Sequence, residues 1–104
     1  MTLSKYDVFV EPAAAEKMFA HVKFLAQVSV PAAERLYDEL NAAIDSLKTN
    51  PRICPYYKPK RAIDAELRHK VCGKRYRIVF EIINTYVYVY DIQDCRQDTD
   101  KNLI

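Results

Sequence analysis

Residues 74–93 read KRYRIVFEIINTYVYVYDIQ, two runs of β-branched and aromatic residues separated by Asn84 and Thr85. Such runs favour β-strands, and a two-residue polar break between them is typical of a tight hairpin. A similar run precedes this stretch, and the break between the two contains Cys72 and Gly73. We therefore predict three consecutive antiparallel strands over residues 66–71, 74–83 and 86–93.

The first half of the chain is predicted to supply one strand and a hairpin of two helices. Residues 6–10 alternate like a strand, and apolar residues recur at helical spacing over 13–28 and again over 33–47. Ser29 can cap the second helix, which ends where the proline-containing loop 51–65 begins. The order predicts an α+β fold, β-α-α-β-β-β, with the helix hairpin packed on one face of a mainly antiparallel four-stranded sheet.

Length and composition limit the classes of protein that this chain can represent. The 104 residues are 50% hydrophobic and 29% charged, as expected for one globular domain spanning residues 1–104. No apolar run approaches the roughly 20 residues of a membrane span, and the N-terminus has no signal-peptide pattern, so we expect a cytoplasmic protein with no membrane contact.

Glycine and cysteine usage argues against cofactor and metal chemistry. Gly73 is the only glycine, which excludes the glycine-rich loops that hold nucleotide phosphates. Cys54, Cys72 and Cys95 form no CxxC pair, so we expect reduced thiols. The sequence therefore predicts no metal and no cofactor.

Positive charge is concentrated in the middle of the chain. Residues 52–77 contain nine lysines and arginines against two acidic residues, whereas acidic residues outnumber basic ones on both sides of this segment. The segment is a candidate surface for a phosphate backbone or for an acidic protein partner. Its candidate substrate-binding residues are Lys58, Lys60, Arg61, Lys70, Lys74 and Arg75.

Strand pairing predicts which face carries this charge. A two-residue turn at Cys72 and Gly73 places Arg68 opposite Arg77 and Lys70 opposite Arg75, on the face away from the helices. The same face would carry Glu81, Tyr86, Tyr88 and Tyr90. Cations interleaved with aromatic rings suit RNA, but the same face could bind a partner protein or be merely solvated.

Three further residues need separate interpretation. Asp91 falls on the apolar side of this register, which predicts a bulge or a strand end near it. His21, inside the first predicted helix, is interpreted as structural, because no second ligand stands at helical spacing. His69 is predicted to point toward the helices, so a core or rim role is favoured over acid–base chemistry.

The stretch LRHKVCGKRYRIVFEIINTYVYVYDIQDCRQD, residues 67–98, resembles the C-terminal sheet of the RelE/ParE superfamily. Together with YDVFVEPAAAEK at residues 6–17 and the helix hairpin, the resemblance covers nearly the whole chain. It implies the toxin of a type II toxin–antitoxin system, of the kind that stabilises plasmids. The implied partner is a co-encoded antitoxin whose C-terminal segment wraps across the toxin.

The resemblance implies two alternative mechanisms. RelE-like toxins cleave mRNA on the ribosome without metal or cofactor, whereas ParE-like toxins poison DNA gyrase by binding; an inactive, antitoxin-binding member is a third possibility. Arg68 or Arg77 matches the strand arginines of the family, and Arg96 matches the arginine of the terminal motif, here DCRQD. A RelE-like tyrosine after that motif is absent, and the residues that could replace it are Tyr88, Tyr90 or, in a shifted register, His69.

The sequence assigns candidate catalytic roles to Arg68, Arg77, Arg96 and Tyr88. The convergence of cations and tyrosines on one predicted face favours the mRNA endoribonuclease over the gyrase poison.

Overall fold

The computed structural model describes residues 5–97 and 101–104 and contains the predicted order of elements. The elements are β1 (Asp7–Val10), α1 (Pro12–Ala26), α2 (Val30–Ser46), the short 3-10 helix η1 (Pro51–Ile53), β2 (Leu67–Cys72), β3 (Tyr76–Ile83) and β4 (Tyr86–Asp94). The predicted α+β fold is therefore confirmed, and η1 lies within the proline-containing loop predicted over residues 51–65.

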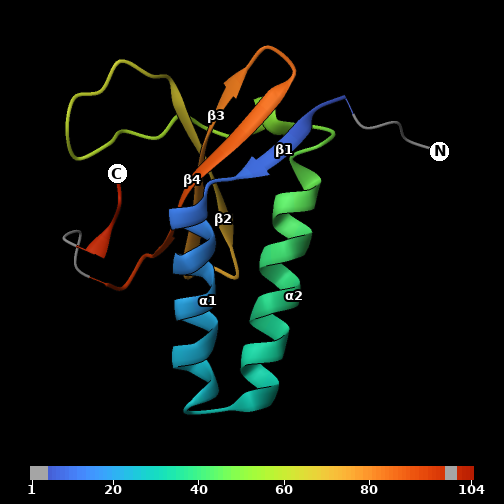
Figure 1. Ribbon diagram of the computed structural model, residues 1–104, viewed down its shortest axis with the longest axis vertical. Coiled ribbons are helices and arrows are strands. Elements are labelled where there is room, and N and C mark those ends of the chain that lie inside the picture. The colour runs from blue at the N-terminus through green and yellow to red at the C-terminus, as the bar shows by residue number, and fades with distance from the viewer. Residues whose placement is uncertain (1–4, 98–100) are drawn as a thin grey trace.

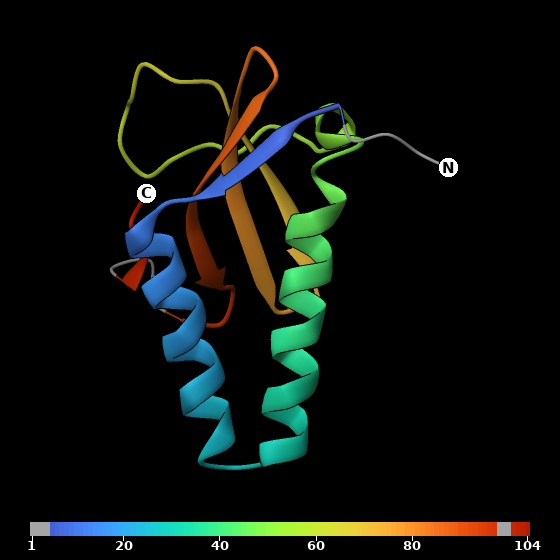
Figure 2. The same ribbon diagram turned by 45° about the vertical axis from the view of Figure 1, so that its right-hand side comes forward.

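The four strands form one mixed sheet in the order β1-β4-β3-β2. The pairs β2–β3 and β3–β4 are antiparallel, whereas β1 runs parallel to β4. Helices α1 and α2 lie side by side on one face of this sheet and leave the other face free of helices (Figures 1 and 2). We call the two sides the helix face and the free face. Among the residues that the structure describes, no helix is long and apolar enough to cross a membrane.

Local sequence explains where the helices begin. The Ser29 hydroxyl accepts a hydrogen bond from the Ala32 amide at 3.2 Å, which is the predicted N-cap of α2. Pro12 and Pro31 stand in the first turns, where a missing N–H removes no intrahelical bond.

The hydrophobic core lies between the helix hairpin and the helix face. Its large members on the helices are Met18, Leu36 and Leu40, and on the sheet Tyr76, Ile78, Phe80, Val87, Val89 and Ile92. These sheet residues alternate along β3 and β4, as expected for strands that are covered on one face.

The β3–β4 hairpin has the predicted register. Ile83 pairs with Tyr86 across a two-residue turn in which Asn84 adopts a left-handed conformation, with φ 56°. The predicted irregularity near Asp91 is confirmed as well. Phe80 pairs with Val89 and Val79 with Asp91, so Tyr90 is an additional residue in β4 and forms a bulge.

The β2–β3 hairpin differs from the prediction. Cys72 pairs with Tyr76, so the turn contains three residues, and two of them, Gly73 and Lys74, have φ near 60°. Because the register is shifted by an odd number of residues, the two faces of β2 are exchanged relative to β3. The predicted stack of four cations on one face is therefore wrong.

The new register separates the basic residues of β2 from Arg77. Arg68 pairs with Phe80 and Lys70 with Ile78, so both belong to the helix face. His69 alternates with them and belongs to the free face with Arg77. The predicted orientation of His69 toward the helices is wrong for the same reason.

Candidate functional site

Four polar side chains gather on the free face of the sheet. Gln93 of β4 is paired with Arg77 of β3, and His69 of β2 lies on the same face. Tyr57, from the loop before β2, lies over them. Its ring centre is 5.7 Å from the Arg77 guanidinium and 5.9 Å from the centre of the His69 ring, which it meets edge-on. We call Tyr57, His69, Arg77 and Gln93 the Arg77 cluster.

The Arg77 cluster has unused hydrogen-bonding capacity. His69 Nδ1, Arg77 Nε and Gln93 Oε1 are buried without a hydrogen-bond partner. Buried polar atoms are normally paired, so these three unpaired atoms mark the cluster as unusual. Burial, and then the positive charge of Arg77, lower the pKa of His69 below its ordinary value. The surroundings of His69 therefore favour the neutral imidazole over the imidazolium.

The loop before β2 also closes the outer edge of the sheet. The Tyr57 amide donates to the Leu67 carbonyl at 2.8 Å, and the His69 amide donates to the Pro55 carbonyl at 3.0 Å. These bonds hold Tyr57 beside β2 and so position its ring over the Arg77 cluster.

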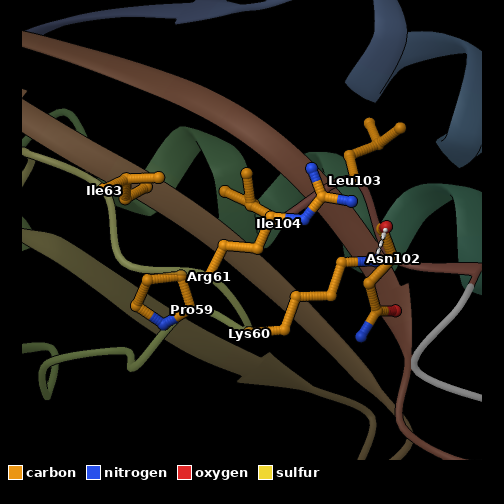
Figure 3. Close-up of a pocket in the computed structure, with 7 residues that line it drawn as sticks. All are labelled: Pro59, Lys60, Arg61, Ile63, Asn102, Leu103 and Ile104. Carbon is orange, nitrogen blue, oxygen red and sulfur yellow. Dashed lines mark hydrogen bonds between the residues drawn. The ribbon is translucent and has the colours of Figure 1, made fainter.

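Residues 101–104, which we call the C-terminal segment, lie against this cluster. The Ile104 main-chain oxygen accepts hydrogen bonds from the Tyr57 hydroxyl at 2.8 Å and from Gln93 Nε2 at 3.1 Å. Between this segment and the loop before β2 lies a pocket of about 420 Å³ (Figure 3). It is lined by Pro59, Lys60, Arg61, Ile63, Asn102, Leu103 and Ile104.

Asp91 anchors the C-terminal segment from beneath. This fully buried carboxylate accepts hydrogen bonds from the Leu103 amide at 2.7 Å, the Ile92 amide at 2.9 Å and Gln93 Nε2 at 3.0 Å. It also pairs with Lys17 of α1 at 3.0 Å. The sequence signalled only that Asp91 disturbs the strand pattern and gave no sign of its partners.

Arg68, a predicted catalytic residue, is engaged within the protein. Its Nη1 donates to the carbonyl oxygens of Arg52 at 3.0 Å and Cys54 at 2.7 Å. Its guanidinium lies 4.3 Å from the ring centre of Tyr56. These contacts fasten the loop after η1 to β2, at a site that the sheet separates from Arg77.

The other predicted basic residues are dispersed. Arg96 is exposed beyond the end of β4 and contacts the Asp94 carboxylate at 3.4 Å; Asp98, the last residue of the DCRQD stretch, lies outside the described residues. Lys74 and Arg75 occupy the β2–β3 turn, and Lys70 is on the helix face. Lys58 is exposed in the loop that also carries Lys60 and Arg61, the two basic residues beside the pocket.

The predicted tyrosines have two different environments. Tyr88 stacks on Phe9 of β1 with ring centres 5.6 Å apart, and Tyr86 lies beside the same ring at 5.9 Å. We call Phe9, Tyr86 and Tyr88 the aromatic patch. Tyr90 instead donates a hydrogen bond to Glu81 at 2.6 Å. Burial and this hydrogen bond raise the pKa of Tyr90 above its ordinary value, so it stays protonated.

The remaining titratable candidates have structural surroundings. His21 is buried, donates from Nε2 to the Ile92 carbonyl at 2.7 Å and packs against Tyr76, which confirms its predicted structural role. All three cysteines are free thiols. Within residues 5–97 and 101–104, no group of three or more His, Cys, Asp or Glu residues could hold a metal ion.

Comparison with known families gives a match that covers most of the chain. Residues 8–99, from β1 to beyond the end of β4, match the family described as "ParE toxin of type II toxin-antitoxin system, parDE". No match was found among curated proteins.

Proposed function

This chain belongs to the ParE toxin family of type II toxin–antitoxin systems, and we propose that it acts by binding DNA gyrase. The family implies an antitoxin as a partner. In this proposal residues 1–104 form a single toxin domain that works in the cytoplasm and poisons its target without cleaving RNA.

The observation that carries this proposal is the separation of the basic side chains. When the 2′-hydroxyl of RNA attacks the adjacent phosphate, the transition state is a phosphorane that carries extra negative charge. Cations stabilise this charge only if they converge on that one group. Arg68 belongs to the helix face and is bonded to carbonyl oxygens, whereas Arg77 belongs to the free face. A binding surface has no such requirement for convergence.

The free face has the composition of a protein-binding surface. It combines the Arg77 cluster with the aromatic patch, and tyrosine and arginine are enriched among the residues that dominate binding energy at interfaces. The aromatic patch includes two half-exposed rings, Phe9 and Tyr86. We propose that Arg77 and these rings contact the target directly.

A ribosome-dependent mRNA endoribonuclease is the second candidate, favoured by the proximity of His69 and Arg77. A neutral imidazole could accept the 2′-hydroxyl proton while Arg77 stabilises the phosphorane. Arg96 and Tyr88 would then serve as further catalytic groups, and Lys58, Lys60, Arg61, Lys70, Lys74 and Arg75 as contacts to RNA.

Two measurements on cells separate the candidates. The protein is produced without an antitoxin, and plasmid supercoiling and translation are followed in parallel. We expect growth to stop and supercoiling to change while translated messages stay intact in primer extension. Cleavage of a translated message would refute the gyrase proposal, and normal growth with abundant folded protein would identify an inactive member.

The same assays on Arg77→Ala and Arg96→Ala distinguish binding from chemistry. For a gyrase poison, each change removes contact energy of about 1–3 kcal/mol, and toxicity follows the affinity measured in a gyrase pull-down. For an endoribonuclease, cleavage falls by roughly 10²-fold with far less effect on ribosome binding. Arg35→Ala is the matched control, because Arg35 is exposed on α2, which packs on the helix face.

A further inference from the structure

The C-terminal segment is held almost entirely through its main chain. The carbonyl oxygens of Lys101, Asn102 and Ile104 accept hydrogen bonds, and the Leu103 amide donates one. Their partners are the side chains of Lys17, Lys60, Tyr57, Gln93 and Asp91, at 2.7–3.1 Å. Figure 3 shows the bond between Lys60 and Asn102.

This arrangement has the properties of a peptide-binding groove. In the recognition of extended peptides, main-chain hydrogen bonds supply affinity whatever the sequence, and pockets for side chains supply preference. Here the partners come from α1, from β4 and from the loop before β2, and Leu103 and Ile104 line the pocket that also includes Ile63. The groove therefore binds this segment through its main-chain polar atoms, with Ile104 half-buried beside the pocket and Leu103 still 44% exposed.

The C-terminal segment contacts the Arg77 cluster through Tyr57 and Gln93. The Tyr57 hydroxyl is fixed by its bond to the Ile104 oxygen and accepts a further bond from Gln93 at 3.0 Å. The ring of the same tyrosine covers Arg77 and lies edge-on to His69. Removing the C-terminal segment removes one of the two hydrogen bonds of this hydroxyl and leaves the bond from Gln93.

We propose that the groove is a docking site for a peptide segment held through its main chain, which this chain fills with its own residues 101–104. The segment acts as an intramolecular competitor. A partner that uses the groove, or that contacts Arg77 and His69 beneath Tyr57, must first displace it. The proposal is independent of whether the target is gyrase or ribosome-bound mRNA.

The first test compares the full chain with a chain shortened after residue 100, with the N-acetylated peptide Lys-Asn-Leu-Ile as the competitor. The His69 ring is titrated by NMR. We expect the pKa of His69 to rise toward its ordinary value in the shortened chain, because burial by Tyr57 decreases while Arg77 remains, and to fall again when the peptide is added. The peptide should bind the shortened chain at least tenfold more tightly than the full chain. Equal binding to both chains, or an unchanged His69 titration, would overturn the proposal.

The second test uses the full chain and does not depend on the folding of a shortened one. Tyr57→Phe keeps the ring and removes the hydroxyl that bonds to Ile104. We expect the Leu103 amide, which donates to Asp91, to exchange with solvent about tenfold faster in this variant. Tyr37→Phe on α2 is the matched control and should leave the exchange of Leu103 unchanged. Unchanged exchange in Tyr57→Phe would refute the role of Tyr57 in holding the segment.

Discussion

Asp91 is the residue whose replacement should disturb the fold most through polar contacts alone. Its side chain is fully buried and accepts hydrogen bonds from two main-chain amides, from Gln93 and from the Lys17 ammonium. Removing one partner of a buried ion pair typically costs about 3–5 kcal/mol, because the other charge is left without compensation. The Lys17 side chain keeps 18% exposure and so regains part of its hydration. We therefore expect Asp91→Ala to cost about 3 kcal/mol, at the lower end of that range.

The assay is urea unfolding at pH 7, followed by far-UV circular dichroism, with thermal unfolding beside it. For a domain of this length each kcal/mol lowers Tm by roughly 4 °C, so Asp91→Ala should lower Tm by about 12 °C. Asp45→Ala is the matched control. The Asp45 carboxylate is 70% exposed and pairs with Lys48 at 2.8 Å, so its loss should cost less than about 1 kcal/mol.

A double-mutant cycle with Lys17→Met isolates the ion pair from the other bonds of Asp91. We expect a coupling energy of about 1–2 kcal/mol, because residues in direct contact do not contribute additively. An Asp91→Ala variant that is no less stable than Asp45→Ala, or a coupling energy of zero, would refute this account of the buried carboxylate.

Three further outcomes are expected. Gly73→Ala should destabilise the protein by about 1 kcal/mol in the same urea assay, because Gly73 has φ 62° and a Cβ there would lie 3.2 Å from the flexible Glu39 carboxylate. Gly73→Asn should cost less, because asparagine tolerates this backbone conformation. The pKa of His69 is lower in the folded protein, so the free energy of unfolding of the wild type should fall as pH drops below about 6.5. His69→Gln should flatten this dependence, and identical pH profiles for the two proteins would contradict the lowered pKa. Replacing all three cysteines with alanine should preserve toxicity in growth assays wherever circular dichroism shows a folded protein, and its loss in a folded variant would indicate a chemical role for a thiol.

The two hairpins show what local sequence can determine. Asn84 adopts positive φ at little cost, so the break between β3 and β4 identified both the turn and the register. In the β2–β3 turn, Lys74 also has positive φ, and lysine gives no sequence signal for that conformation. The pattern therefore favoured a two-residue turn, and one wrong turn length exchanged the faces of Arg68 and His69.

The candidate site depends on contacts that no sequence periodicity encodes. Arg77 was identified from its place in a basic strand, and its assignment to the free face was correct. Tyr57 belongs to a proline-containing loop and reaches Arg77 from a distant part of the chain. The C-terminal segment is positioned by Asp91 and Gln93. The bulge in β4 shifts the register of both residues and so sets the face of the sheet on which their side chains lie. Such contacts follow from the assembled sheet and not from local propensity.

The parallel pairing of β1 with β4 has a consequence for how the protein is made. Val8 pairs with Val87, so β1 has no partner in the sheet until β4 has been synthesised. The helix hairpin likewise packs against β3 and β4, which are both made late. Contacts between such distant segments form slowly and only after the chain connecting them exists. The four-stranded sheet can therefore form only after β4 has been synthesised, and no folded toxin exists before that point.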